Sequence, residues 1–236
     1  MGLNLIKNYS LNFSLPKRHK KQIKFIIIHY TGMKSEKAAI KKLIEPESKV
    51  SSHYFIRNNG QIINMVPDLY IAWHAGRSSW GKYNSLNKYS IGIEINNPGH
   101  QHGYKQFKLN QIISLKKLLK FFIKRYNIKN YYILGHSDIA PDRKKDPGEK
   151  FPWKELAKNG LCYWHNLNEK KIKKFRRQKI TLNYERTFLK NLCKIGYSIT
   201  NNKSAIKAFQ RRYRQALIDG KIDKECFLIS KNLLKH

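Results

Sequence analysis

The chain has 236 residues, with 48 Lys and Arg against 15 Asp and Glu, and a net charge of +33 at pH 7. Its hydrophobic fraction of 41% and aromatic fraction of 12% are sufficient to bury a core, which excludes an intrinsically disordered chain. The sequence contains no stretch near the ~20 consecutive apolar residues that cross a bilayer, so a membrane-spanning protein is also excluded.

The positive charge is compatible with an anionic polymer as partner, either nucleic acid or a cell wall. Lysines are spread along the whole chain, and the aromatic and basic motif of a known nucleic-acid reader is absent, so we do not expect nucleic acid. The three cysteines lie far apart and outside any CxxC pair, which favours free thiols over a disulfide framework. The sequence leaves the oligomeric state open.

No secretory signal is visible near the N-terminus. The longest apolar run there is Leu3 to Ile6, and Lys17 to Lys21 is basic where a signal peptide would place its cleavage site. These features favour the cytoplasm, with the periplasm as the alternative if the start is trimmed or export is unconventional.

Strand and helix patterns alternate from the N-terminal part onward. Ile23 to Ile28 is a continuous apolar run typical of a buried strand. Ser35 to Ile44 begins with an N-capping residue and has apolar residues at helical spacing, which predicts a helix. Ser52 to Ile56 and Gln61 to Val66 flank the turn Asn58-Asn59-Gly60, which predicts a hairpin.

The pattern continues with a strand, a long helix and another strand. Ser90 to Asn96 alternates, with isoleucines on one face and Glu94 on the other. Leu109 to Tyr126 predicts an amphipathic helix, and Tyr131 to Leu134 predicts the next strand. Together these elements predict an α/β domain over residues 1–165, with a mixed central β-sheet covered by helices.

The last third of the chain has a different organisation. Residues 166–182 are rich in Lys and Arg, which predicts a basic linker that can fold as a solvated helix. Tyr184 to Ile195, Ser204 to Leu217 and Asp223 to Leu234 are short, amphipathic and bounded by Gly or an N-cap signal. They predict a small three-helix domain over residues 183–236.

Two of the nine histidines lie where rigid strands end. His29 closes the first apolar strand, and His136 follows Ile133-Leu134-Gly135. The loop after His136 is punctuated by Pro and Gly and can fold the carboxylate of Asp146 back toward the strand end. Two imidazoles and one carboxylate leave a fourth position for water, which is the arrangement of catalytic zinc.

Five motifs occur in order between residues 20 and 160. They are FIIIHYTG (Phe25 to Gly32), SSHYFIRNNGQI (Ser51 to Ile62), AWHAG (Ala72 to Gly76), NKYSIGIEINN (Asn87 to Asn97) and GHSDIAPDRKKDPG (Gly135 to Gly148), the last followed by FPW. This series resembles the zinc-dependent N-acetylmuramoyl-L-alanine amidases of type 2, relatives of the peptidoglycan recognition proteins. Their common order makes the resemblance specific.

The resemblance implies one zinc ion bound by His29, His136 and Asp146. It also implies that Glu94 is the catalytic carboxylate, which takes a proton from water and passes it to the leaving amine, and that Lys144 stabilises the oxyanion. Without the motifs, a solvated ion pair is the commoner role for a strand residue such as Glu94. Lys144 would then be part of a charged loop.

Substrate contacts are implied for four further residues, which are Trp73, His74, Ala75 and Asn87. The resemblance places AWHAG beside a cleft where a sugar or peptide stacks and hydrogen-bonds. A packed aromatic corner is the alternative role of Trp73 and His74.

The C-terminal helices resemble the small peptidoglycan-binding domain found in some of these amidases. The resemblance rests on FLKNLCKIGY (Phe188 to Tyr197) and AIKAFQRRYR (Ala205 to Arg214). A helical bundle without a ligand is the alternative, since Phe209 and Tyr213 are as suited to a core as to a binding platform.

The resemblance predicts hydrolysis of the amide between N-acetylmuramic acid, including its 1,6-anhydro form, and the L-alanine of the stem peptide. The substrate would be peptidoglycan or a muropeptide, in cell-wall turnover, recycling or remodelling. A non-catalytic peptidoglycan-binding or recognition protein on the same scaffold is the alternative.

Overall fold

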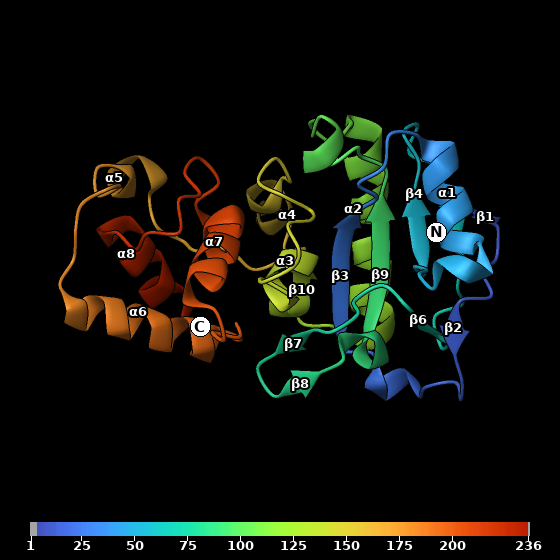
Figure 1. The fold of residues 1–236 in the computed structure, drawn as a ribbon, viewed down its shortest axis with the longest axis horizontal. Helices are drawn as coiled ribbons and strands as arrows, with labels where there is room; N and C mark the ends of the chain where they lie inside the picture. The colour runs from blue at the N-terminus through green and yellow to red at the C-terminus, as the bar shows by residue number, and fades with distance from the viewer. Residues whose placement is uncertain (1–3, 236) are drawn as a thin grey trace.

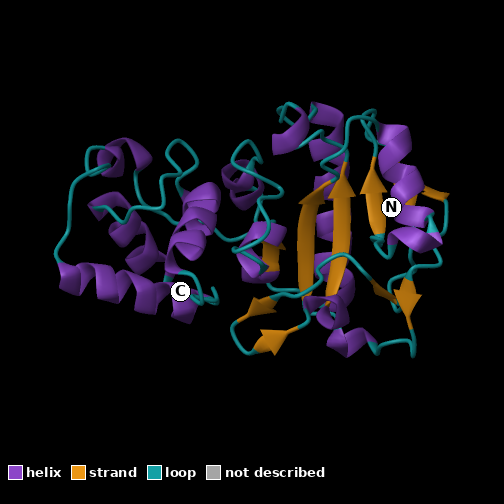
Figure 2. Cartoon of the chain, viewed as in Figure 1, coloured by secondary structure: helices purple, strands orange, loops and turns teal. Residues whose placement is uncertain are grey.

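The computed structural model describes residues 4–235. Its N-terminal part is a mixed β-sheet with helices on its faces, and its C-terminal part is a group of helices beside the sheet (Figure 1). Strands are confined to the first part, whereas the second is helical (Figure 2). The α/β fold with additional C-terminal helices agrees with the sequence prediction.

A six-stranded sheet has the order β1-β5-β4-β9-β3-β10. Its strands are β1 (Leu5–Lys7), β3 (Phe25–Tyr30), β4 (Tyr54–Ile56), β5 (Ile62–Asn64), β9 (Ser90–Ile95) and β10 (Ile133–Gly135). The predicted hairpin β4–β5 is antiparallel, and the remaining pairs in this sheet are parallel. Two small sheets pair β2 (Phe13–Ser14) with β6 (Ile71–Ala72) and β7 (Ser79–Trp80) with β8 (Tyr83–Asn84).

The α-helices are α1 (Glu36–Ile44), α2 (Leu109–Tyr126), α3 (His136–Ile139), α4 (Trp153–Lys158), α5 (Glu169–Lys173), α6 (Leu182–Ile195), α7 (Asn202–Tyr213) and α8 (Lys224–Leu233). The short 3₁₀ turns are η1 (Lys20–Gln22), η2 (Pro46–Ser48), η3 (Leu86–Tyr89), η4 (His100–His102) and η5 (Asn130–Tyr132). Between residues 4 and 235, none of the helices has the length and apolar character to cross a membrane.

Most predicted elements are confirmed, with differences at their ends. Helix α2 has the predicted bounds, and α1 starts after Ser35, whose hydroxyl accepts the N–H of Ala38 at 3.1 Å. The strand predicted from Tyr131 starts at Ile133 instead, because the residues before it form η5. Helix α7 ends at Tyr213 rather than at Leu217.

The sheet separates two hydrophobic clusters because side chains alternate along each strand. On one face, Ile26 and Ile28 of β3 join the isoleucines of β9 and the apolar face of α2. On the other face, Phe25 and Ile27 join a cluster that continues into α6, α7 and α8. The sheet therefore shares one of its cores with the C-terminal helices.

This shared core crosses the predicted linker. Ile172 of α5 is buried in it, together with Phe188 and Phe209 of the C-terminal helices. Residues 166–182 thus include a helix that packs on α8, although the predicted domain limits themselves stay a prediction. The C-terminal helices are attached by packing as well as by the chain.

A buried ion pair joins the two parts at Asp138 of α3. Its carboxylate accepts from Arg212 Nη1 of α7 at 2.6 Å and from the Tyr197 hydroxyl at 2.7 Å. It also accepts the N–H of Gly135 at 2.8 Å. The guanidinium of Arg212 lies 4.1 Å from the centroid of the Trp153 ring. These contacts fix the C-terminal helices against the segment that begins with His136.

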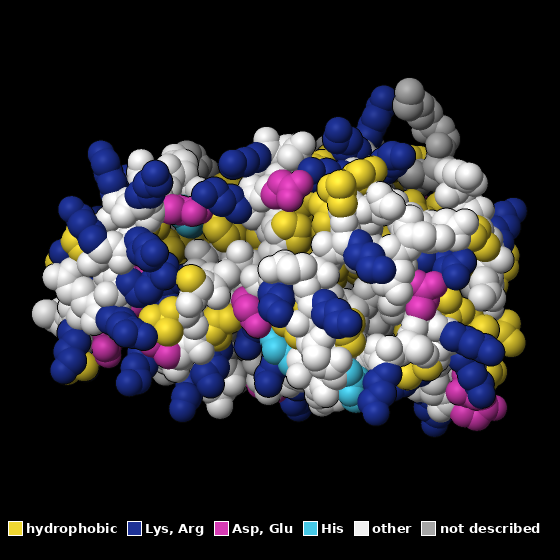
Figure 3. All heavy atoms as spheres, turned by 90° about the horizontal axis from the view of Figure 1, so that it is seen from above, with side chains coloured by type: hydrophobic (Ala, Val, Ile, Leu, Met, Phe, Trp, Pro, Cys, Tyr) yellow, Lys and Arg dark blue, Asp and Glu magenta, His cyan; other side chains and the backbone are white. Residues whose placement is uncertain are grey.

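Basic side chains are distributed over the surface. On the face shown in Figure 3, Lys and Arg lie over both parts of the chain, and acidic side chains are few. Some of the acidic side chains lie inside the protein: Asp138, Asp223 and Glu225 are buried and form ion pairs with arginines. The exposed surface is left with most of the lysines, which makes it broadly positive.

We expect Arg212→Met to lower the free energy of unfolding by about 3–5 kcal/mol, because it leaves the Asp138 carboxylate buried without its counter-charge. Urea unfolding of the whole chain measures this loss. Arg77→Met is the matched control: Arg77 forms an exposed pair with Asp142, at 3.1 Å, and its removal should cost about 1 kcal/mol or less. Equal losses in the two variants would contradict a stabilising ion pair at the junction.

Candidate metal centre and active site

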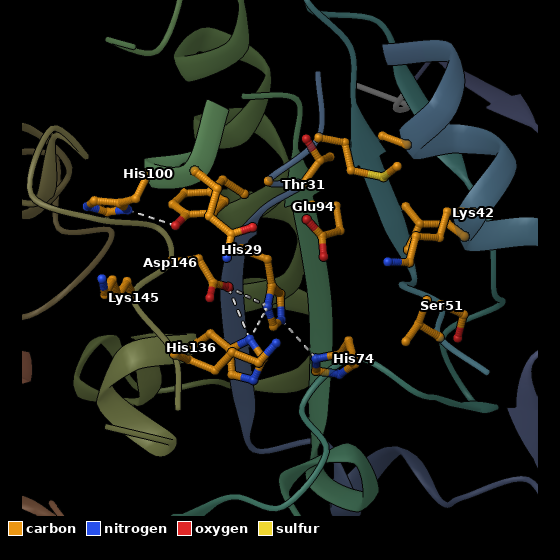
Figure 4. Close-up of a pocket in the computed structure, with 18 of the residues that line it drawn as sticks. His29, Thr31, Lys42, Ser51, His74, Glu94, His100, His136, Lys145 and Asp146 are labelled. Atoms are coloured by element: carbon orange, nitrogen blue, oxygen red, sulfur yellow. Dashed lines mark hydrogen bonds and ion pairs between the residues drawn. The ribbon is translucent and has the colours of Figure 1, made fainter. Parts of the chain in front are cut away.

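The site lies on the face of the sheet opposite helix α2. His29 of β3 and Glu94 of β9 are partners in the parallel register, so both side chains project from the same face. Figure 4 shows them entering one cavity, with Lys42 of α1 across from Glu94. The cavity has a volume of about 360 Å³.

Three predicted ligands converge in this cavity. The Nδ1 atoms of His29 and His136 lie 2.9 Å apart, and Asp146 Oδ2 lies 3.0 Å from the first and 3.1 Å from the second. All three side chains are buried. His136 enters from the start of α3, beside β3, and the N–H of Ser137 donates to the Asp146 carbonyl at 2.8 Å, which folds the loop back.

A chain of hydrogen bonds decides which nitrogen of His29 carries a proton. The Ser90 hydroxyl donates to the Leu86 carbonyl at 2.6 Å, so its oxygen accepts the N–H of His74 Nε2 at 3.1 Å. Burial lowers the pKa of His74 well below its ordinary value, so this ring is neutral and its Nδ1 is an acceptor. His29 Nε2 therefore donates to His74 Nδ1 at 3.0 Å.

This bond leaves Nδ1 of His29 without a proton. Burial, followed by the neighbouring His136, lowers the pKa of His29 to about 4, so its ring is neutral and carries a proton only on Nε2. The free lone pair of Nδ1 points toward His136 and Asp146, as Figure 4 shows.

His136 also turns its Nδ1 atom toward the other two predicted ligands, His29 and Asp146. Its Nε2 lies 3.1 Å from the carbonyl oxygen of Ala75, which only accepts, so Nε2 carries a proton. Arg143 donates to the same carbonyl and to that of Arg77, which fixes this loop. Nδ1 of His136 is therefore the ring nitrogen that faces His29 and Asp146.

The donor set fits a divalent metal ion. Nδ1 of His29, Nδ1 of His136 and the Asp146 carboxylate face one another, and imidazole nitrogen together with carboxylate oxygen is a donor set that divalent metal ions take in proteins. Their separations of 2.9–3.1 Å approach the ~3.3 Å between ligands of a tetrahedral ion with bonds of ~2.0 Å. Within residues 4–235, His29, His136 and Asp146 are the one such cluster of three.

Glu94 has the features expected of a general base. Burial, and then repulsion from Asp146, raises its pKa to about 8, although Lys144 and Lys42 act in the opposite direction. Its Oε2 is buried and has no hydrogen-bond partner among the described residues. A buried carboxyl group with a raised pKa in a cavity is typical of acid–base catalysis.

The other predicted residues lie in or beside the cavity. Lys144, Trp73 and His74 line it, whereas Ala75 and Asn87 do not. The Asn87 side chain accepts the N–H groups of His74 and Ala75 at 3.1 and 2.7 Å, so it shapes the loop that carries them. Their predicted contacts with substrate stay predictions.

Four residues of the site are not among the sequence predictions. Ser90 fixes the proton of His29 through His74, and Arg143 fixes the loop whose Ala75 carbonyl lies beside His136. Lys42 and His100 line the cavity, and His100 Nδ1 is 2.8 Å from the Tyr30 hydroxyl. A Ser on a strand and a Lys on a helix carry no local signal of such roles, because only the tertiary contacts define them.

A mixed sheet that carries two histidines, an aspartate and a buried glutamate in one cavity has the side chains of a hydrolase active site, three of which could hold a metal ion. The N-acetylmuramoyl-L-alanine amidase family matches residues 19–149, and the chain belongs to this family. The resemblance in the five motifs is thus confirmed, and the chain is an enzyme of this family rather than a recognition protein without activity.

Two characterised proteins illustrate the relationship by sequence. The N-acetylmuramoyl-L-alanine amidase AmiD of Escherichia coli is 35% identical over 234 residues, which cover 91% of this chain and 83% of that protein. The 1,6-anhydro-N-acetylmuramyl-L-alanine amidase AmpD of Haemophilus influenzae is 38% identical over 108 residues, which cover 45% of this chain and 56% of that protein.

Solved structures agree over nearly the whole chain. AmiD of E. coli in complex with anhydro-N-acetylmuramic acid-L-Ala-D-γ-Glu-L-Lys superposes with a TM-score of 0.80 at 32% identity, covering 94% of this chain and 92% of that one. AmpDh3 of Pseudomonas aeruginosa with an anhydromuramic pentapeptide has a TM-score of 0.78 at 30% identity, covering 93% and 94%. Both matches include the C-terminal helices.

We expect Ser90→Ala to weaken metal binding by about 10- to 100-fold, because His74 Nε2 loses its acceptor and no longer fixes the proton of His29. Competition with a chromophoric chelator measures the dissociation constant. Ser114→Ala is the matched control, since the Ser114 hydroxyl also donates to a backbone carbonyl, that of Gly60, at 2.6 Å but on α2. Unchanged metal affinity in Ser90→Ala would refute the role of the hydrogen-bond chain from Ser90 through His74 to His29.

Glu94 should make the metal-free protein less stable as the pH rises. Its pKa of about 8 in the folded state exceeds its ordinary 4.5, so stability is complete below pH 4.5 and is lost as the pH rises through 8. Glu94→Gln should therefore raise the melting temperature of chelator-treated protein by several degrees near pH 9 and leave it unchanged near pH 4. Glu155→Gln on the exposed surface of α4 should change neither value.

Proposed function

We propose that the chain is a zinc-dependent N-acetylmuramoyl-L-alanine amidase. It hydrolyses the amide between the lactyl group of N-acetylmuramic acid, including the 1,6-anhydro form, and the L-alanine of the stem peptide. The observation that carries this proposal is the convergence of two imidazole nitrogens and a carboxylate in the cavity that Glu94, with its unpartnered Oε2, also lines.

His29, His136 and Asp146 would hold the zinc ion. When bound, zinc lowers the pKa of a coordinated water and polarises a carbonyl group, as in other hydrolases with three protein ligands. Glu94, whose pKa is raised by burial and by Asp146, would lie in the same cavity as this ion. The nitrogen and oxygen ligands are of the type that zinc prefers.

Glu94 would perform the proton transfers. Its Oε2 makes no internal hydrogen bond, so it is free to accept the proton of the attacking water and then to protonate the nitrogen of the departing L-alanine. Lys144 lines the same cavity on the loop before Asp146, where its ammonium group stabilises the negative charge that develops on the scissile carbonyl oxygen. Trp73 and His74 line the same cavity and would contact the substrate there.

The names and ligands of the relatives support the substrate assignment. The solved complexes of AmiD and AmpDh3 hold anhydromuramic peptides, and both proteins match this chain over more than nine-tenths of its length. Hydrolysis of the same amide by this chain, in wall turnover, recycling or remodelling, is the proposal that follows. The C-terminal helices would contribute binding to the wall.

We expect zinc-loaded protein to release peptides that begin with L-alanine from purified muropeptides. Glu94→Gln should lower the rate by about 10²- to 10⁴-fold while zinc binding is retained, because only the general base is lost. Chelator-stripped protein should be inactive and recover when zinc is restored. Mass spectrometry of the products, on both anhydro-muropeptide and intact polymer, measures these rates and the preference between the substrates.

No peptide from either substrate, with zinc bound at stoichiometry, would refute the amidase proposal. Full activity of Glu94→Gln would instead refute the assignment of the base. The comparison of zinc content and product in the same sample separates the two outcomes.

A further inference from the structure

A second hollow lies at the junction of the two parts of the chain. It has a volume of about 810 Å³, against about 360 Å³ for the active-site cavity, and none of its lining residues lines that cavity. Its walls come from the β7–β8 hairpin and η5 on one side and from the C-terminal ends of α6 and α8 on the other. Ligand sites favour clefts between domains of this kind.

Tyrosine rings form one wall of this junction cleft. Tyr83, Tyr131 and Tyr132 line it and are partly or largely exposed, with Tyr131 47% exposed. Tyr83 and Tyr132 pack against the buried Phe25 ring, with centroids 5.0 and 4.5 Å away, and Tyr131 packs on Tyr132 at 4.5 Å. The rings are therefore held in place before any ligand arrives, which lowers the entropy cost of binding.

The edges of the same wall are polar. Among the residues that the structure describes, no hydrogen bond is made by the hydroxyls of Tyr83, Tyr131 or Tyr132. The exposed Lys82 and Lys194 stand on the two sides of the cleft, and the ammonium group of Lys82 lies 5.9 Å from the Tyr83 ring. The cleft therefore combines fixed aromatic faces with free hydroxyls and two cations.

This combination fits a carbohydrate with anionic substituents. A pyranose ring has an apolar C–H face that packs on an aromatic ring and an edge of hydroxyls that hydrogen-bond with tyrosine hydroxyls. The carboxylates of the stem peptides, and the lactyl carboxylates that removal of the peptides leaves free, would pair with the lysines. We propose that the junction cleft binds the glycan strand of peptidoglycan, a proposal that rests on the function proposed above for the active site.

Binding at two places would favour the polymer over soluble fragments. A strand held at the junction would raise the effective concentration of its stem peptides at the active site, whereas a muropeptide bound in the active-site cavity has no neighbouring strand to occupy the cleft. Loss of the junction cleft should therefore raise KM for intact peptidoglycan and leave kcat/KM for soluble muropeptide unchanged. Both walls must be fixed relative to each other for this effect, and the pair between Asp138 and Arg212 provides that fixation.

The test uses glycan strands stripped of their peptides, with titration calorimetry of the full zinc-loaded chain. Tyr131→Ala should weaken binding by roughly tenfold, the loss expected for one aromatic platform, and Tyr131→Phe should retain most of it. Tyr9→Ala is the matched control, because Tyr9 is 51% exposed and lies outside the cleft. The Tyr9→Ala protein should bind the glycan strands with the same affinity as the unchanged chain.

Absence of glycan binding, or equal binding by Tyr131→Ala, would overturn the proposal. Tighter binding of a thymidine oligonucleotide than of glycan, with the same dependence on Tyr131, would assign the cleft to nucleic acid and overturn it as well. Normal release of peptide from muropeptides together with any of these results means that this proposal alone fails. Glycan binding that depends on Tyr131 in a protein that releases no peptide means that the amidase proposal alone fails.

Discussion

The site depends on one geometric constraint: two imidazole nitrogens and a carboxylate oxygen are held within 3.1 Å of each other. These three side chains come from distant parts of the sequence, so contacts outside the cluster have to hold them together. The register of β3 positions His29, the start of α3 positions His136, and the bond from Ser137 to Asp146 closes the loop. Much of the N-terminal fold can be understood as the frame that keeps these three groups in contact.

Burial serves both the ligands and the base, although it acts on them in opposite ways. It lowers the pKa of His29 and so keeps the ring neutral, as a metal ligand requires. The same loss of water raises the pKa of Glu94, which makes this group a stronger proton acceptor once it is ionised. A cation in the centre would compensate both costs, so metal binding, protonation and stability are coupled at this one place.

Local sequence patterns predict the strands and helices, whereas tertiary contacts decide which further side chains take part in the site. The alternation in β9 placed Glu94 on the face opposite the isoleucines, and the structure has that arrangement because one face of the strand packs on α2. The role of Ser90 has no such signal, since it depends on a ring that comes from a loop 16 residues earlier. Asn87 illustrates the same limit: its substrate contact stays a prediction, and the two backbone N–H groups that its side chain accepts had no signal in the sequence.

The junction between the two parts was least visible in the sequence, because a basic segment separates them along the chain. The apolar residues of β3 and of α6 to α8 nevertheless form one core, and Asp138 places an ion-pair partner only two residues from His136. A flexible tether would let each part move freely and would leave no fixed walls between them. Because the junction is packed, the C-terminal helices can support the metal-binding segment on one side and complete an aromatic cleft on the other.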